Sequence, residues 1–371
     1  MHDDGLLFLR QDGPAVSRPD DVQGDPWLLL VVDDEEQVHA VTQLALDGVS
    51  FLGRPVHLLS AYSAAEASAI LQTEAEVALV LLDVVMETET AGLSLVRWIR
   101  RELGNTDIRI ILRTAHPGHA PERRVILDYD INDYKTKTEL TSERLFSTVV
   151  AGLRSYQQVR TVNRLLGDVK VAQRATVFAL ADLAEHRDTD TGAHIRRVHD
   201  LSFAVAEALR TRGHYTDILD DAFLEAIGLA STLHDVGKVS VPDHILRKPG
   251  RLDDHEWAVM KTHTVAGGNI LARSAALLGG QGYLAMGADI ARHHHERFDG
   301  GGYPDGLSGQ EIPLAARITA VADVYDALIS ARPYKEAWTA ERALAVMREE
   351  AGRHFDPLVL NAFLDIMANR L

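Results

Sequence analysis

The apolar stretch WLLLVV at residues 27–32, followed at once by Asp33 and Asp34, sets the pattern of the first part of the chain. A second apolar run, VALVLL at residues 77–82, also ends in an aspartate, Asp83. Weaker or shorter runs lie at 55–59, 108–112 and 125–127, and helical periodicity marks 35–49, 64–74 and 93–103. Strands that alternate with helices predict a parallel sheet covered on both faces. We expect a doubly wound, five-stranded α/β domain over residues 25–140, after a polar tail at 1–24.

The chain changes character near residue 140. Apolar residues then recur every three or four positions, as in an amphipathic helix: Leu145, Val149, Leu153, Tyr156, Val159 and Val162. Beyond about residue 175, helical stretches alternate with loops that contain glycine and proline. We expect a helical connector at 141–175, interrupted at Gly167-Asp168, and an all-α helical bundle at 176–371. The connector's spacing is not regular enough for a clear heptad repeat, so a dimerising coiled coil and a core helix both stay open.

Composition excludes several classes of function. The 371 residues include 38 Lys and Arg against 54 Asp and Glu, a net charge of −16, and no cysteine. An acidic protein is poorly suited to general binding of nucleic acid or anionic membranes, which requires a positive field. Without cysteine, disulfides, thiolate metal sites and cysteine nucleophiles are impossible. The sequence has neither a signal-peptide pattern nor a membrane-length apolar run, so we expect a soluble, cytoplasmic protein without membrane insertion.

Any metal site must therefore use histidine and carboxylate, and the second half of the chain is rich in candidates. They are His194, the stretch LHDVGK at 233–238, His263, the stretch HHHE at 293–296, and Asp323. A single helical histidine is more often a core or surface residue than a ligand, and His-Asp pairs also occur at 2–3 and 199–200. Together, imidazole and carboxylate donors suit Fe, Mn or Zn. Two adjacent divalent metals are the usual apparatus for in-line displacement at phosphorus.

The stretch HHERFDGGGYP at residues 294–304 resembles the HD-GYP family of cyclic-dinucleotide phosphodiesterases. The same family order continues in IPLAAR at 312–317, ADVYDAL at 322–328, RPYK at 332–335 and HFDP at 354–357. The resemblance covers about residues 176–371. It implies a two-metal phosphodiesterase that hydrolyses cyclic di-GMP to linear pGpG, to GMP or to both, with Fe or Mn as the metals.

The resemblance also assigns roles to individual residues. The implied metal ligands are His194, His234, Asp235, His263, His294, His295 and Asp323. The implied catalytic residues are Asp235, as a bridging carboxylate, and Lys238, and the implied substrate-binding residues are Lys238, Arg332, Lys335, Gly302 and Tyr303. Family members with a third metal carry Glu four residues before the first ligand His, where this chain has the shorter Asp190. We expect two metals, and a third with Asp190 as a ligand stays open.

The N-terminal domain resembles a response-regulator receiver. The resemblance implies Asp83 as phosphoacceptor, Asp33 and Asp34 as Mg2+-site residues, and Thr114, Lys137 and Tyr134 as switch residues. The match is looser than in the second half, because Glu87 occupies a position where receivers usually have proline, and Lys135 competes with Lys137 for one role. A degenerate receiver that folds without being phosphorylated stays an alternative. A functional receiver implies a cognate histidine kinase as partner.

We interpret the chain as a bacterial two-component response regulator, a homodimer whose receiver controls a cyclic di-GMP phosphodiesterase. Two alternatives come from other classes. A catalytically silent domain would bind the cyclic dinucleotide as a sensor or adaptor, and another HD-type enzyme would hydrolyse a different nucleotide. Metal analysis, followed by chromatography of cyclic di-GMP incubated with the protein, distinguishes these three functions.

Overall fold

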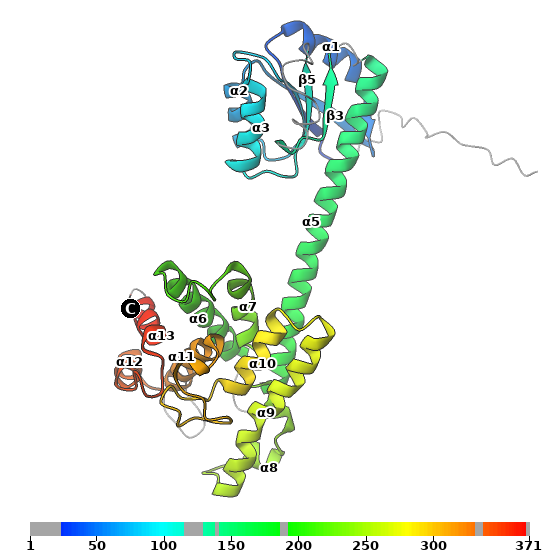
Figure 1. Ribbon diagram of the computed structural model, residues 1–371. Coiled ribbons are helices and arrows are strands. Elements are labelled where there is room, and N and C mark those ends of the chain that lie inside the picture. The colour runs from blue at the N-terminus through cyan, green and yellow to red at the C-terminus, as the bar shows by residue number, and fades with distance from the viewer. Residues whose placement is uncertain (1–23, 115–128, 138–140, 186–191, 331–336, 369–371) are drawn as a thin grey trace, which may run out of the picture. The chain divides into compact units, whose positions relative to one another are not determined.

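The computed structural model describes residues 24–114, 129–137, 141–185, 192–330 and 337–368. The chain divides into two compact units, residues 1–167 and 168–371. The first unit contains a sheet with its covering helices, and the second is largely helical (Figure 1). This arrangement confirms the predicted fold class, an α/β domain followed by a helical region. The helix α5 (Ser142–Glu185) begins in the first unit and ends in the second.

The first unit is built on a six-stranded sheet in the order β2-β3-β1-β4-β5-β6. The strands are β1 (Trp27–Val32), β2 (Ser50–Phe51), β3 (Arg54–Ala61), β4 (Val77–Asp83), β5 (Arg109–Thr114) and β6 (Asp133–Thr136). Neighbouring strands are parallel, except that β2 and β3 form a short antiparallel pair. The carboxyl ends of parallel strands meet at one edge of the sheet, and Asp33 and Asp83 lie there.

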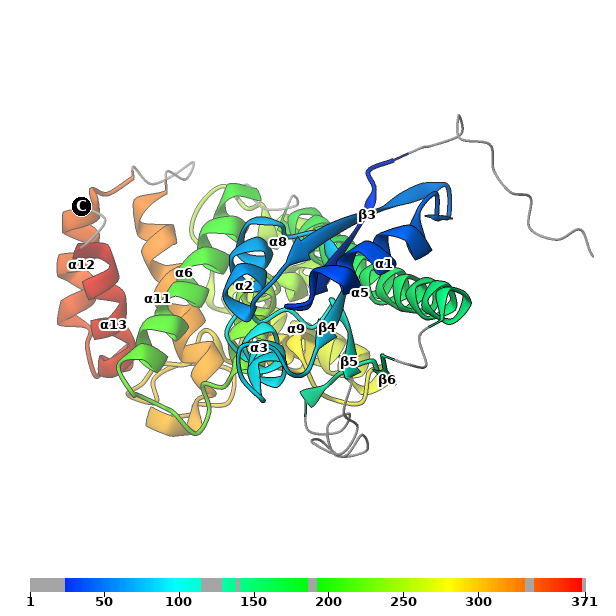
Figure 2. The same ribbon diagram turned by 90° about the horizontal axis from the view of Figure 1, so that it is seen from above.

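Helices cover both faces of this sheet (Figure 2). Leu30 and Val32 of β1 pack with α2 (Ala64–Thr73) and α3 (Ala91–Arg101). Leu29 and Val31 instead pack with the end of α1 (Glu36–Leu46) and the start of α5, because successive strand side chains point to opposite faces. A strand buried on both faces consists of a continuous apolar run, which explains why the runs at 27–32 and 77–82 predict strands correctly.

The strand that completes the sheet is not the one predicted. The weak run at 125–127 lies outside the described residues, and the structure places the edge strand β6 at Asp133–Thr136. In this strand only Tyr134 is buried, and its neighbours are polar and half-buried. An edge strand with one inward residue has no apolar run, so apolar patterning alone does not detect it.

Helix α5 is continuous, so the predicted interruption of the helix at Gly167-Asp168 is wrong, although the boundary between the two compact units falls at this point. The helix has 44 residues and passes through Gly167. Glycine in a helix costs only about 1 kcal/mol relative to alanine.

The second unit packs its helices around a larger and a smaller apolar cluster, with a minor third one. Besides the end of α5, it contains α6 (Gly192–Thr211), α7 (Asp221–Ser231), α8 (Asp243–Leu246), α9 (Asp254–Leu277), α10 (Tyr283–His293), α11 (Leu314–Ile329), α12 (Ala340–Glu349), α13 (Pro357–Ala368) and the 3-10 turns η2 (Val236–Ser240) and η3 (Gly309–Glu311). The larger cluster joins α6, α7, α11, α12 and α13, and the smaller joins α5 to α6, α7, α9 and α10. The minor cluster lies between η2, α8 and α9. None of the helices in the described ranges is long and apolar enough to cross a membrane.

Candidate functional site

The His-Asp pair lies in the turn that joins α7 to η2. This turn packs directly on α9, and glycine makes the contact possible. A Cβ atom at Gly237 would lie 1.9 Å from the carbonyl oxygen of His263, so only glycine fits there. The close approach brings Asp235 to His263, whose Nε2 is 3.3 Å from Asp235 Oδ1.

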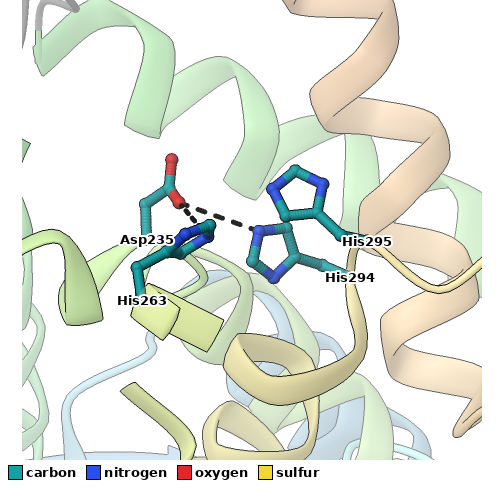
Figure 3. Close-up of side chains that lie close together, drawn as sticks. All are labelled: Asp235, His263, His294 and His295. Atoms are coloured by element: carbon teal, nitrogen blue, oxygen red, sulfur yellow. Dashed lines mark ion pairs between the residues drawn. The ribbon is translucent and has the colours of Figure 1, made fainter. Parts of the chain in front are cut away.

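Four of the predicted ligands form one buried group. Asp235, His263, His294 and His295 each offer a donor atom within 4.8 Å of the others (Figure 3). The Nε2 atom of His294 lies 3.7 Å from Asp235 Oδ1. His294 follows the last residue of α10, so three separate segments of the chain supply this group.

The other three predicted ligands lie beside this group. The Nε2 atoms of His194 and His234 are 3.7 and 3.8 Å from Asp323 Oδ1. His234 also links the two groups, because its Nε2 is 3.4 Å from Asp235 Oδ2. The structure therefore places all seven predicted ligand side chains in one continuous cluster.

The cluster contains one residue that sequence reasoning missed. Glu185, the last residue of α5, is buried and lies with His194 and His234, its Oε1 4.0 Å from His194 Nε2. No motif marks it, because it is nine positions before His194 and separated from it by the start of another helix.

The histidine rings are held in one orientation by their Nδ1 atoms. Nδ1 of His194 contacts Asp326 Oδ2 at 2.7 Å, and those of His234, His263 and His294 contact the carbonyl oxygens of Ser231, Met260 and Ile290 at 2.8–3.0 Å. Among the described residues, the buried Nε2 atoms of His234, His263 and His294 have no hydrogen-bond partner. An imidazole bound through Nδ1, with Nε2 left for another ligand, is the usual arrangement of a metal-binding histidine. The donor set therefore fits a metal centre.

The electrostatics of the cluster fit the same interpretation. Burial lowers the pKa of His234 to about 4 and also lowers the pKa of His263 and His295. Burial alone would raise the pKa of Asp235, but Lys238, with Nζ 2.8 Å from Oδ2, and the nearby histidines hold it well below its ordinary value. Neutral imidazoles and ionised carboxylates are the protonation states in which these side chains bind metals. His194 differs, because its hydrogen bond to Asp326 and the nearby carboxylates outweigh the effect of burial and raise its pKa to about 9, so metal binding at this ring requires the loss of a proton.

The glycine-rich loop closes one side of the cluster. Glu296 Oε1 accepts hydrogen bonds from the backbone N–H groups of Asp305 and Gly306 at 2.7 and 3.1 Å, which folds the loop back on itself. A Cβ atom at Gly302 would lie 2.3 Å from a backbone nitrogen, so a side chain there is excluded. Tyr303 stacks on His295, with ring centroids 4.9 Å apart.

Sequence reasoning also missed two neighbours of Tyr303. The ring of Trp257 meets that of Tyr303 edge-on at 6.3 Å, and its side chain is 47% exposed. Lys261 Nζ lies 5.7 Å from the Tyr303 ring centroid. Three of the predicted residues, Asp190, Arg332 and Lys335, lie outside the described residues.

A second candidate site lies at the carboxyl edge of the sheet. Lys137 Nζ is 2.7 Å from Asp83, 2.8 Å from Glu35 and 3.1 Å from Asp33. These three carboxylates form a group that could hold Mg2+, whereas Asp34, the predicted member, is exposed and outside that group. Of the two candidate lysines, Lys137 contacts this acidic group, whereas Lys135 pairs with Asp133 at 3.1 Å.

Two predicted switch residues lie close to this second site, together with an unpredicted cation. Thr114 ends β5 and is buried, and its carbonyl oxygen accepts a hydrogen bond from the Lys137 backbone N–H. Tyr134 is buried in the core beneath α3. Arg113 is 3% exposed, and its guanidinium lies 3.4 Å from Asp33.

Known proteins resemble both units. The family model of the response regulator receiver domain matches residues 29–149, and that of the HD domain matches residues 180–359. The 3'3'-cGAMP-specific phosphodiesterase 2 of Vibrio cholerae is 31% identical over 489 alignment positions, which cover 92% of this chain and 91% of that protein. A cyclic di-GMP phosphodiesterase of the same organism is 44% identical over 210 residues, 57% of this chain and 43% of that protein. The cyclic di-GMP phosphodiesterase response regulator RpfG of Xanthomonas campestris is 40% identical over 284 residues, 74% of this chain and 71% of that protein.

Proposed function

Because this chain belongs to the family of receiver-linked HD-GYP phosphodiesterases, we propose that it hydrolyses cyclic di-GMP to linear pGpG, GMP or both. The observation that carries the proposal is the set of buried Nε2 atoms of His234, His263 and His294 around Asp235. A cluster built only for stability would pair these nitrogens with hydrogen-bond acceptors. In a cation-binding cluster these Nε2 atoms instead point toward the common position of the ion.

We assign the metal ligands to two neighbouring positions. Asp235, His263, His294 and His295 would hold one ion, and His194, His234 and Asp323 would hold the other, with Asp235 contributing to both. Imidazole and carboxylate donors without sulfur suit Fe, Mn or Zn, and the resemblance to the family favours Fe or Mn. Two such ions supply Lewis-acid stabilisation of the charge that develops on phosphorus oxygens during in-line displacement.

The chain's own residues bind and orient the substrate in this proposal. Lys238, 13% exposed at its side chain, is close enough to the cluster to meet a phosphate oxygen through a charge-assisted hydrogen bond. Tyr303 and the half-exposed Trp257 offer ring faces on which a nucleobase can stack. Arg332 and Lys335 are proposed to supply further cations, although they lie outside the described residues.

A second substrate has a specific observation in its favour. The relative that aligns with 92% of this chain is named as specific for 3'3'-cGAMP. The two substrates share the phosphodiester ring and differ in one base, so the same metal cluster serves either. The assay therefore offers both substrates in parallel to the metal-loaded protein and separates the products by chromatography.

Asp235→Asn serves as the inactive control in this assay. Formation of pGpG or GMP from cyclic di-GMP supports the proposal. Cleavage of 3'3'-cGAMP alone would mean that 3'3'-cGAMP, and not cyclic di-GMP, is the substrate. Tight binding of a cyclic dinucleotide without any cleavage would favour a sensor or adaptor.

We also propose that the receiver regulates this activity through phosphorylation of Asp83, with Mg2+ held by the adjacent carboxylates and a cognate histidine kinase as phosphoryl source. The position of Lys137 supports it, since a cation 2.7 Å from Asp83 is suited to neutralise an added phosphoryl group.

A further inference from the structure

One carboxylate in the metal cluster has no role in the family motifs described above. Glu185 is 2% exposed, and its Oε1 lies 4.0 Å from His194 Nε2. Its carboxylate, His194 and His234 all offer donor atoms within 4.8 Å of one another. Asp323 Oδ1 faces the same two imidazoles at 3.7 and 3.8 Å.

These separations suit ligands of a common ion better than they suit direct hydrogen bonds. A distance of 4.0 Å between nitrogen and oxygen is beyond hydrogen-bond range. Two donors bound to one ion, each about 2.1 Å from it, can lie up to about 4.2 Å apart. All three measured distances fall within that limit.

The surrounding contacts direct the donor atoms toward this shared space. Nδ1 of His194 is already engaged by Asp326, and Nδ1 of His234 by the carbonyl oxygen of Ser231, so each ring presents Nε2. The Nε2 of His234 is fully buried and has no hydrogen-bond partner among the described residues. This buried nitrogen atom is a second observation that indicates a ligand-binding position on this side of the cluster.

The last turns of α5 position Glu185. Val177 and Ala181 of α5 are buried against Ile195, Leu229 and Leu233 in the smaller apolar cluster of the second unit. Ala184, next to Glu185, is also buried. The carboxylate is therefore held by a packed helix end, which gives it one position relative to the histidines.

We propose that Glu185 is a ligand of a metal ion held by His194 and His234, an inference that rests on the proposed function. The assignment gives α5 a chemical role. Its first turns pack in the receiver core through Leu145, Val149 and Leu153, and its last residue binds the ion.

Titration of metal into the apoprotein tests this proposal without using enzyme activity. The full-length chain is stripped of metal by chelation, and Mn2+ binding is followed by isothermal titration calorimetry, with elemental analysis for stoichiometry. Glu185→Gln keeps the shape of the side chain but removes its charge. We expect at least a tenfold weaker affinity at one of two sites, with the other site unchanged. Asp182→Asn, at an exposed position one turn earlier on α5, should bind as the wild type does.

If circular dichroism shows that Glu185→Gln does not fold, the titration with Glu185→Asp tests the assignment instead. Glu185→Asp keeps the charge but retracts the oxygens, so it should also weaken one site. Wild-type stoichiometry and affinity in a folded Glu185→Gln protein, or in Glu185→Asp if only that folds, would overturn the assignment. Failure of the wild type to bind any Mn2+ would instead overturn the proposed function, and the two failures are therefore distinguishable.

Discussion

Asp326 Oδ2 lies 2.7 Å from Nδ1 of His194, and the same carboxylate binds the guanidinium of Arg197. Both residues of the first pair are buried. Burial alone would lower the pKa of His194, but the hydrogen bond to Asp326 and the nearby carboxylates Asp323 and Glu185 raise it to about 9. The pair therefore fixes which nitrogen of His194 faces the cluster.

Loss of Asp326 should weaken metal binding although Asp326 does not face the cluster. Asp326→Asn replaces a charged acceptor by an amide that can present its nitrogen to the ring, so the orientation of His194 is no longer enforced. Removal of such outer partners typically costs 10–100-fold in metal affinity. Calorimetric Mn2+ titration measures the effect. Arg197→Gln removes another partner of Asp326 and should change affinity far less, whereas equal losses in both variants would indicate general destabilisation.

Asp235 should be required for both metal content and turnover. Asp235→Asn weakens a ligand shared between two proposed metal positions, and we expect both metal content and cyclic dinucleotide hydrolysis to fall to background. The helical fold should persist by circular dichroism. The matched control is Asp200→Asn, because His199-Asp200 is also a His-Asp pair but Asp200 is exposed. Full hydrolysis by metal-free Asp235→Asn protein would contradict the proposed mechanism.

The sequence predicts the site better than it predicts the segments that join the domains. The seven clustered side chains could be named as predicted ligands because a family motif specifies residue types and spacing together. Glu185 could not, since it reaches His194 only through the packing of Val177 and Ala181 at the end of α5. Motif spacing does not encode a contact of that kind.

The errors in the first unit have similar physical causes. Strand β6 was missed because an edge strand with the single inward residue Tyr134 lacks an apolar run. The break at Gly167 was predicted from local propensity, which is a weak signal inside a long helix. Glu35 lies in the acidic group with Asp33 and Asp83, and residue type alone does not reveal that arrangement, while the role of Asp34 stays a prediction.

Trp257 should contribute to substrate affinity. If a nucleobase stacks on the aromatic pair of Trp257 and Tyr303, Trp257→Ala removes a ring contact worth about 1–3 kcal/mol. This corresponds to a rise in KM of roughly five- to 150-fold, with little change in metal content. Trp257→Phe keeps a ring face and should restore most of the affinity. Identical kinetics for the wild type and Trp257→Ala would show that the nucleobase does not stack on Trp257.

The exposed part of α5 should mediate a homodimer. Val162, Leu166 and Val169 are each more than half exposed and lie three and four residues apart, the spacing of a coiled-coil seam. A second copy of α5 would cover this stripe. Light scattering on the wild type should give a dimer, and the double substitution Leu166→Glu and Val169→Glu should give a monomer. Arg174→Glu, at another exposed position of the same helix, should stay dimeric. A monomeric wild type would contradict the prediction.

Phosphorylation of the receiver should change hydrolysis by a moderate factor. An aspartyl phosphate at Asp83 adds negative charge beside Asp33 and Glu35, so its stability depends on Mg2+ and on Lys137, which contacts all three carboxylates. The phosphate would draw the buried Thr114 of β5 and Tyr134 of β6 into new positions. Coupling between such sites is typically about 1–3 kcal/mol, so acetyl phosphate or a beryllofluoride mimic should change activity by roughly five- to 150-fold.

Two lysines provide the matched comparison for this regulatory prediction. Lys137→Ala removes the cation that contacts Asp83, and the response to beryllofluoride should disappear together with the response of Asp83→Ala. Lys135→Ala removes a charge of the same kind only two residues away, but Lys135 pairs with Asp133 outside the acidic group, so the response should be retained. Because basal hydrolysis depends on the second unit, all three variants should keep the unstimulated rate. A response that persists in Asp83→Ala would mean that the receiver acts as a scaffold and that another signal controls the enzyme.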